Sequence, residues 1–285
     1  MDEPKILKDG IAFGESPRWH ENRLWFCDWA AEELIAVDMD GTSELIAEVH
    51  SFPFCIDWLP DGTLLIVSAR EQRVLRMETD GSLVMHADLS RLSNRPPNNE
   101  IVVDGRGHVY VNGGGFDMMA GEEFAPGTVA LIGSDGAARE VADGIAFANG
   151  MAVTPDNATL IVAESYAARL TAFDIAADGS LGNRRVWAEL AQGAAPDGIC
   201  IDADGAVWYA DVPNQHCVRV AEGGEVAETI KLDRGAFACM LGGPDGRTLF
   251  IVAREWRGIG AGTDGPRTGQ ILSVGGAPAP HAGWP

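Results

Sequence analysis

PDGICIDADGAVWYADV (residues 196–212) contains the repeating unit that decides the fold of this chain. A short apolar run, ICI, leads into the turn Asp204-Gly205, and a second apolar run, VWY, follows the turn. Asp-Gly pairs supply the positive φ angles that tight hairpin turns need. The segment therefore predicts a β-hairpin made of two buried strands.

The same pattern occurs six times along the 285 residues. The second strands of the six units begin at Leu24, Leu64, Val109, Leu160, Val207 and Leu249, at intervals of 40, 45, 51, 47 and 42 residues. A period of about 45 residues with strands and without helical patterns is typical of β-propeller blades.

Further Asp-Gly hairpins supply outer strands, for example RVLRMETDGSLVMHADL at residues 73–89. The sixth unit lacks a strand, because only the Pro- and Gly-rich residues 275–285 follow QILSV (270–274), and there we expect a flexible tail. The N-terminal PKILKD (4–9) is a spare strand that can pair with the last blade and remove an exposed sheet edge. We therefore predict an all-β protein, a single six-bladed β-propeller domain over residues 1–285 with four antiparallel strands per blade, closed by the N-terminal strand.

Composition and charge narrow the range of partners. The net charge of −21 repels phosphate backbones and anionic lipids, so we expect neither nucleic acid nor a membrane as partner but a small-molecule substrate. The N-terminus lacks the pattern of a signal peptide, and no apolar run approaches membrane length, which predicts a cytoplasmic protein. The five cysteines lack CxxC spacing and are expected to be reduced structural thiols.

Alignment of the six units places one residue per unit at the start of the first strand, where side chains converge on the central channel of a propeller. These residues are Glu15, Cys55, Asn99, Asn149, Asp197 and Cys239. Four of the six carry side-chain oxygens, which suit hard divalent cations such as calcium, magnesium or manganese, and carboxylates also bind zinc. The alignment therefore predicts a divalent-metal site in the channel.

Two of these residues also resemble turn residues, since Asp197 lies in a Pro-Asp-Gly sequence and Asn149 precedes Gly150. The repeat separates the two interpretations. The fifth unit already has its hairpin turn at Asp204-Gly205, and the fourth has its turn at Pro155-Asp156. Asp197 and Asn149 are therefore expected to face the channel.

Four segments resemble one known family. They are GESPRW (14–19), NNEIVVDGRGHVYV (98–111), FANGMAVTPDNATLIVAES (147–165) and PDGICIDADGAVWYADV (196–212). In their order and spacing they are similar to the SMP-30/gluconolactonase/luciferin-regenerating enzyme-like family. The resemblance implies a six-bladed propeller with one catalytic divalent ion (Ca, Zn, Mn or Mg) that hydrolyses a lactone.

The resemblance also implies roles for individual residues. Glu15, Asn149 and Asp197 would be the metal ligands, and Asp197 would in addition be the general base that activates water. Asn99 would bind the metal water or the substrate.

The third unit departs from the family pattern of Arg-x-Asn-Asp. It reads NRPPNNE, with Arg95 four residues before Asn99 and with Glu100 where Asp is usual. We assign substrate binding to Asn99, Arg95 and Glu100, and Arg70 or Arg254, at the ends of second strands, are alternative substrate arginines. Two long connections, 112–127 and 254–269, are expected to overhang the same face as candidate lids.

Two further hypotheses keep the propeller but change its function. One is a metal-dependent hydrolase acting on a phosphotriester, and the other is a non-catalytic ligand-binding propeller with a structural metal ion. The sequence has no G-x-S-x-G elbow, no P-loop and no Rossmann fingerprint, that is, no G-x-G-x-x-G between a strand pattern and a helix pattern, which disfavours a serine hydrolase or a nucleotide enzyme.

Overall fold

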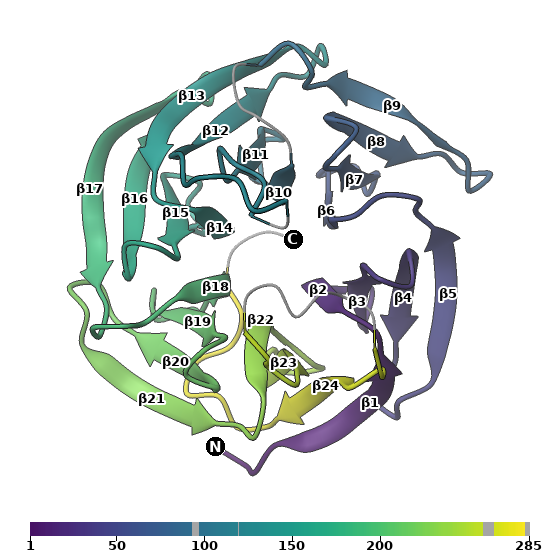
Figure 1. The fold of residues 1–285 in the computed structure, drawn as a ribbon, viewed down its shortest axis with the longest axis vertical. Coiled ribbons are helices and arrows are strands. Elements are labelled where there is room, and N and C mark those ends of the chain that lie inside the picture. The colour runs from purple at the N-terminus through teal and green to yellow at the C-terminus, as the bar shows by residue number, and fades with distance from the viewer. Residues whose placement is uncertain (93–96, 119, 259–264, 283–285) are drawn as a thin grey trace.

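The computed structural model describes residues 1–92, 97–118, 120–258 and 265–282. Within these residues, six four-stranded antiparallel sheets are arranged like blades around a central axis (Figure 1). All regular elements of the described chain are strands. The six-bladed β-propeller that the repeat predicts is therefore confirmed.

The first three blades each run from the centre outward in chain order. Blade one contains β2 (Gly14–His20), β3 (Arg23–Asp28), β4 (Glu33–Val37) and β5 (Ser43–Glu48). Blade two contains β6 (Phe54–Trp58), β7 (Leu64–Ser68), β8 (Arg73–Met77) and β9 (Leu83–Asp88). Blade three contains β10 (Asn98–Val103), β11 (Val109–Gly113), β12 (Gly127–Ile132) and β13 (Ala138–Ile145).

The remaining blades follow the same plan until the last strand. Blade four contains β14 (Ala148–Val153), β15 (Thr159–Glu164), β16 (Arg169–Ile175) and β17 (Leu181–Glu189). Blade five contains β18 (Pro196–Ile201), β19 (Val207–Asp211), β20 (His216–Val220) and β21 (Val226–Lys231). Blade six contains β22 (Gly235–Gly242), β23 (Thr248–Arg254), β24 (Gly269–Val274) and, as its outer strand, β1 (Lys5–Ile11).

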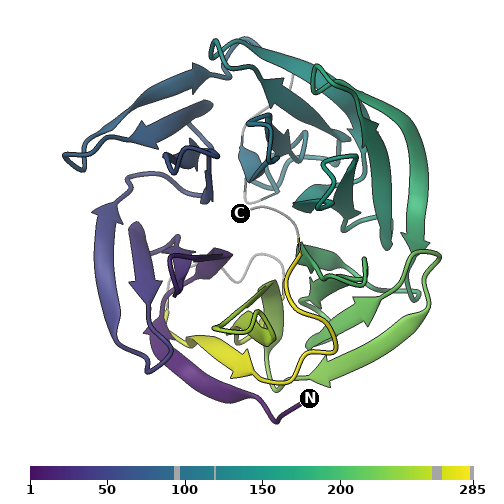
Figure 2. The same ribbon diagram turned by 180° about the vertical axis from the view of Figure 1, so that it is seen from behind.

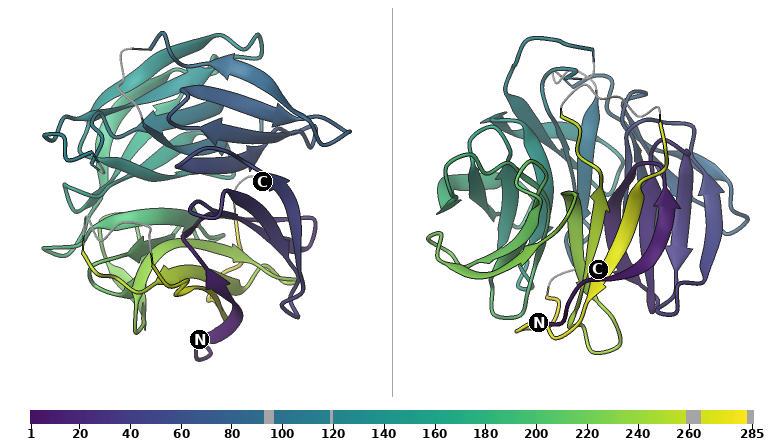
Figure 3. Two further views of the ribbon diagram at one scale, coloured as in Figure 1. Left: turned by 45° about the vertical axis from the view of Figure 1, so that its right-hand side comes forward. Right: turned by 60° about the horizontal axis from the view of Figure 1, so that its bottom comes forward.

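The N-terminal strand closes the ring as predicted. β1 runs antiparallel to β24, with Lys5 opposite Ser273 and Ile6 opposite Leu272. Figure 3 shows the purple β1 lying beside the yellow β24. The first and last segments of the chain therefore complete one blade together, which joins the ends of the ring.

The hydrophobic core lies between the faces of neighbouring blades. The inner strands β6 and β7, for example, are buried throughout, whereas the outer strand β5 is mostly exposed. Between blades one and two, for instance, Leu34, Phe54 and Ile66 pack in one apolar cluster. All five cysteines are buried and free, as predicted. The described residues include no helix of the length and hydrophobicity needed to cross a membrane.

The described part of the C-terminal segment is held against the ring, whereas the sequence predicts a tail there. The N–H of Ala277 donates to the carbonyl of Arg247 at 2.9 Å, and that of Ala282 donates to the carbonyl of Ile201 at 3.1 Å. His281 forms a β-bridge with Asp202. In Figure 2 this yellow segment runs from β24 toward the centre of the ring. Ile201 is the last residue of β18 and Asp202 follows it, so the segment is bonded at the end of β18 that lies away from Asp197.

Candidate metal and catalytic site

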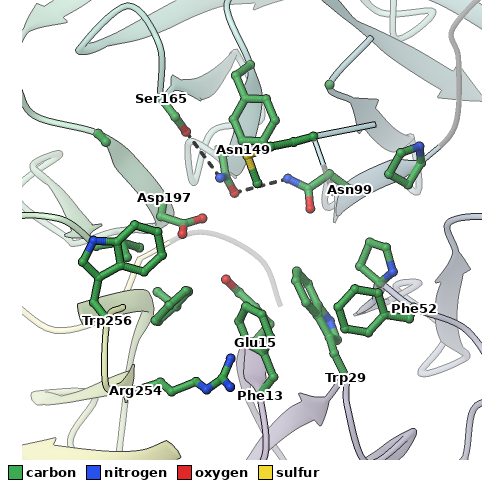
Figure 4. A pocket seen from close by; sticks show the side chains of 18 of the residues that line it. Phe13, Glu15, Trp29, Phe52, Asn99, Asn149, Ser165, Asp197, Arg254 and Trp256 are labelled. Carbon is green, nitrogen blue, oxygen red and sulfur yellow. Dashed lines mark hydrogen bonds between the residues drawn. The ribbon is translucent and has the colours of Figure 1, made fainter. Parts of the chain in front are cut away.

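The four oxygen-bearing residues predicted to converge do so. Glu15, Asn99, Asn149 and Asp197 all line one pocket at the mouth of the channel, where the innermost strands begin. Figure 4 shows their side chains directed toward a common space from β2, β10, β14 and β18. The cavity has a volume of about 310 Å³. A pocket of this size holds a small molecule.

Interruptions in strand pairing contain three of these four side chains, those of Asn99, Asn149 and Asp197, and Glu15 lies at the edge of a fourth interruption. In β2, β10, β14 and β18 the pairing with the next strand shifts by one residue close to the strand start, as in a β-bulge. In β18, Pro196 pairs with Asp211 and Ile199 with Tyr209, so three steps on β18 match two on β19. A bulge re-aims a side chain that regular pairing would direct elsewhere. Asp197 lies within this bulge and points into the pocket.

The glycines that follow Asn149 and Asp197 allow the innermost strands of neighbouring blades to pack closely. A Cβ on Gly150 would lie 2.5 Å from the carbonyl oxygen of Asp197, and a Cβ on Gly198 would lie 2.5 Å from the Cβ of Ala238. Adjacent innermost strands thus approach within the space that only glycine leaves. Asn149-Gly150 and Asp197-Gly198 are therefore contacts between blades, which agrees with their predicted exclusion from hairpin turns.

Hydrogen bonds fix the orientation of the Asn149 amide. Its Nδ2 donates to the Oγ of Ser165 at 3.3 Å, and that Oγ donates to the carbonyl of Pro196 at 2.7 Å. With Nδ2 committed to Ser165, the Asn149 Oδ1 faces the channel, where it accepts from the Nδ2 of Asn99 at 3.3 Å (Figure 4). Asn99 Nδ2 also donates to the carbonyl of Ala148 at 3.3 Å. Both amides therefore present their oxygens to the pocket.

The two carboxyl groups of the site resist ionisation. Burial raises the pKa of Glu15 well above its usual range, and the charge of Asp197 raises it further, although the N–H of Ser16 donates to Glu15 Oε2 at 2.8 Å. Burial likewise raises the pKa of Asp197, helped by the charge of Glu100 and opposed by a hydrogen bond from Asn149. Two carboxylates held together in this way are stable as anions only beside a positive charge.

The donor set fits a hard divalent cation. It offers two carboxylates and two amide oxygens, the ligand type that calcium, magnesium and manganese prefer. Among the described residues no group of three or more His, Cys, Asp or Glu side chains forms a metal cluster, so a site at this position depends on the asparagines. The mutual repulsion of Glu15 and Asp197 is the feature that a bound cation would relieve.

Comparison with known proteins places the chain in a family. Residues 13–255 match the model described as SMP-30/Gluconolactonase/LRE-like region. The chain belongs to this family. It is 25% identical to 6-deoxy-6-sulfogluconolactonase of Pseudomonas putida, over 94% of this chain and 93% of that protein. It is also 25% identical to regucalcin of Xenopus laevis, over 87% and 85% of the two chains.

Solved structures of family members share the fold. A luciferin-regenerating enzyme matches with a TM-score of 0.83 and 18% identity, covering 98% of both chains. The calcium-binding protein regucalcin of Agrobacterium tumefaciens matches with a TM-score of 0.79 and 21% identity, covering 99% of this chain and 95% of that one. At these identities the structural likeness shows the propeller fold alone.

The third blade, where this chain departs from the family pattern, lacks a substrate arginine in the described residues. Arg95 lies outside the described residues. Glu100 is buried below the pocket and does not line it. There its Oε1 accepts from the Nη2 of Arg18 at 3.3 Å, and Arg18 also donates to the carbonyl of Ile101 at 2.8 Å. Glu100 thus takes part in a buried ion pair inside the channel.

The alignment of the six units assigned the wrong residue of blade six, Cys239, to the mouth of the channel. In β22 the residue that lines the pocket is Phe237, at a pairing shift between Ala236 and Ala238. Cys239 lies two residues further along, buried near the carbonyls of blade five. The equivalent positions lie nine to eleven residues before the start of each second strand, and such counting along the sequence cannot detect a local shift in pairing. Cys55, in blade two, is also buried and does not line the pocket.

Both long connections reach the pocket, as expected for loops on this face. Described residues of 112–127 and of 254–269 line it, among them Phe116, Met118 and Trp256. Residues 119 and 259–264 lie outside the described residues. The two loops therefore help to form the walls of the site.

Most of the wall residues were not predicted. Rings from the ends of several strands line the pocket, and their sequence positions have no common spacing. They are Phe13, Trp29, Phe52, Phe116, Phe147, Tyr166, Phe237 and Trp256. A usable signal was their position next to strand ends, since Phe13 precedes β2, Phe52 precedes β6 and Phe147 precedes β14. Aromatic residues there indicate a channel mouth built to bind an apolar group.

Proposed function

We propose that this protein is a divalent-metal-dependent hydrolase that opens a lactone by attack of water, with Asp197 as general base. Glu15, Asn149 and Asp197 would hold the ion, and Asn99 would bind water or substrate. The observation that carries the proposal is the convergence of Glu15 and Asp197, whose raised pKa values reflect burial and the approach of like charges. The named lactonase activity of the Pseudomonas putida relative supports this reaction class.

The residues of the site divide the chemical work. When bound, the ion would polarise the lactone carbonyl and make a water molecule easier to ionise. Asp197 accepts a proton from the attacking water, a contribution typically worth about 10²–10⁴-fold in rate. The oxygen of that water bonds to the carbonyl carbon, the ring C–O bond breaks, and the ring oxygen takes up a proton, which gives a hydroxy acid.

The surrounding residues keep Asp197 and the amides in position. The Ser165 hydroxyl orients Asn149, and Asn149 in turn contacts Asn99 and Asp197. The Asn99 Oδ1 remains available on the pocket side to accept a hydrogen bond from water or from a substrate hydroxyl. Asp197 acts best as a base when only one of its two oxygens contacts the cation, because a bound cation lowers the basicity of a carboxylate.

A metal-reconstitution assay tests the proposal. The protein is stripped of metal with a chelator and assayed on sugar and aryl lactones with calcium, manganese, zinc or magnesium added singly. We expect hydrolysis only with a divalent ion, and a loss of ion binding by calorimetry in Glu15→Gln and Asn149→Ala. Equal hydrolysis with and without metal would reject metal dependence.

A second candidate function is ion binding without catalysis. The structure of the Agrobacterium tumefaciens relative is described as that of a calcium-binding protein. The same experiment separates the two candidates, since saturable ion binding without turnover of any lactone would favour the second.

A further inference from the structure

Among the described residues three arginines line the pocket, and two of them have carboxylate partners. Arg70 is paired with Asp117 at 2.9 Å, and Arg257 is paired with Glu255 at 2.7 Å. The guanidinium of Arg254, at the end of β23, forms no hydrogen bond or ion pair with any described residue. Its guanidinium lies over the ring of Phe13, 4.9 Å from the ring centre (Figure 4).

The two carboxylates whose charges favour the charged form of Arg254, those of Asp28 and Glu255, already have hydrogen-bond partners. Asp28 accepts hydrogen bonds from the N–H groups of Ala12 and Phe13, at 2.9 and 2.7 Å. Glu255 is the partner of Arg257. Burial lowers the pKa of Arg254, and Arg257 lowers it further, so the environment of this cation is one that disfavours positive charge. A partly buried cation is costly when no anion is paired with it, so an anionic group of a ligand would bind favourably to Arg254.

Aromatic rings form two walls on opposite sides of the pocket. One wall comes from blades six, one and two, where Phe13 lies 5.2 Å from Trp29 and 5.1 Å from Phe237 between ring centres. The other comes from blades three and four, where Phe147 and Tyr166 are stacked at 4.8 Å. Flat apolar bodies pack favourably against such faces.

Few polar groups remain for a hydroxyl-rich ligand. Of the polar side chains in the walls, Arg70 and Arg257 are paired with carboxylates, and Ser165 is bonded to Asn149 and Pro196. The amide of Asn98, which is buried, and the hydroxyl of Thr268 are further polar groups of the described walls. A polyhydroxylated chain would place hydroxyls against aromatic rings without hydrogen-bond partners, which is costly. The walls therefore favour an apolar ligand.

We infer that the substrate is an organic anion with a flat, apolar body, whose anionic group pairs with Arg254 while its body lies between the two aromatic walls. The inference rests on the proposed function, because it names the substrate class of the same site. The neutral lactone carbonyl would then face Glu15, Asn149 and Asp197 at the base of the pocket, and the anionic substituent would lie at the side of blade six.

Binding of two matched probes tests the role of Arg254. Calorimetry with the full chain and calcium compares 2-naphthoate with 2-naphthamide, which share a body and differ in charge. We expect the carboxylate to bind about 10- to 100-fold more tightly than the amide, the range for hydrogen bonds to charged groups. Arg254→Gln should abolish this preference, and Arg254→Lys should retain part of it.

A distant arginine controls for net charge. Arg76, on the outer part of blade two, is paired with Glu78 at 2.8 Å, and Arg76→Gln changes the net charge as Arg254→Gln does. The preference for naphthoate should persist in Arg76→Gln. If it persists in Arg254→Gln as well, the carboxylate binds elsewhere and the inference is wrong. Gluconate binding as tightly as 2-naphthoate would reject the apolar body.

Kinetics separate this inference from the proposed function. Dihydrocoumarin and dihydrocoumarin with a carboxylate on its aromatic ring are assayed with each ion, and we expect a higher kcat/KM for the second that depends on Arg254. Metal-dependent hydrolysis of both at equal kcat/KM would sustain the proposed function and reject the inference. Arg254-dependent binding of naphthoate without turnover of either lactone would sustain the inference and reject the proposed function.

Discussion

Asp57 and Asp197 are carboxylates on innermost strands of different blades, and they have opposite surroundings. Asp57, on β6 of blade two, is fully buried, and its oxygens accept from the N–H groups of Trp58 and Val103 at 2.9 and 2.7 Å. Asp197, on β18 of blade five, faces the pocket. Both have raised pKa values because of burial. Only Asp197 is left free to react.

The two strands also differ in how they pair with the next strand of their blade. β6 pairs with β7 without any shift, from Phe54 opposite Ser68 to Trp58 opposite Leu64. β18 contains the bulge that turns Asp197 into the pocket. The bulge thus accounts for the direction of Asp197. Asp57 lies two residues beyond Cys55 on a regular strand, and there it accepts a hydrogen bond from Val103 of the neighbouring blade.

Replacement of Asp197 should have the largest effect. Asp197→Asn keeps the shape but removes the base, so we expect kcat for lactone hydrolysis to fall by about 10²–10⁴-fold. Cys55→Ala, at the corresponding level of β6, should change kcat little, because Cys55 does not line the pocket. Steady-state kinetics on both variants, with circular dichroism to verify folding, measure the contrast. An Asp197→Asn variant with full kcat would exclude Asp197 as the base.

Asp57 should make the free energy of unfolding depend on pH. Burial raises its pKa from 3.8 to about 7, even though Arg18 lies 3.8 Å away and opposes the rise. Between these pH values the folded chain binds the proton more tightly than the unfolded chain, so the contribution of Asp57 is retained at low pH and lost as pH rises to about 7. We expect wild type to lose up to about 4 kcal/mol relative to Asp57→Asn over this range.

Urea unfolding of the two proteins at pH 4.5, 6 and 7.5 measures this difference. Titration of the other carboxyl groups is common to both proteins and cancels. A difference in unfolding free energy that stays constant with pH would show that Arg18 keeps Asp57 ionised throughout.

Replacement of Gly198 tests how closely the bulged strand β18 packs against β22. A Cβ there would lie 2.5 Å from the Cβ and 2.7 Å from the Cα of Ala238, so Gly198→Ala should destabilise the fold by about 1–3 kcal/mol. Gly182, on the outer strand β17, has no atom within 4 Å of the same position, and Gly182→Ala should lie within about 0.5 kcal/mol of wild type. Thermal unfolding compares the two variants. Equal midpoints would mean that β18 and β22 separate easily.

Replacement of His281, which forms a β-bridge with Asp202 just after β18, should have the smallest effect on stability. Burial and the charge of Arg18 lower the pKa of His281 to about 4. The folded chain then binds fewer protons than the unfolded chain between pH 6.5 and 4, so stability is present above this window and falls as pH decreases through it. Because the side chain is only partly buried, we expect wild type to lose about 1 kcal/mol relative to His281→Gln. Unfolding at pH 7 and 4.5 measures this, and equal losses in the two proteins would contradict it.

The sequence predicted much of the fold because hairpins are local. The strands of each blade and the Asp-Gly turns that join them lie close together in the chain. The six repeats determine the number of blades in the ring. The same repeat aligned Glu15, Asn99, Asn149 and Asp197, since equivalent residues of successive blades occupy one level. It failed in blade six, where a pairing shift puts Phe237 in the pocket and Cys239 below it.

By itself, then, the sequence determined the number of blades, the closing strand and the four oxygen-bearing residues, all of which depend on short-range patterns that repeat. Only the tertiary structure decided which residues surround them. The bulges arise in the pairing of strands within a blade. The two aromatic walls, the burial of Glu100 with Arg18 and the lack of a partner for the Arg254 guanidinium among the described residues depend on contacts between blades. Such contacts join residues far apart in the chain, and their geometry is set by how the faces of neighbouring sheets pack.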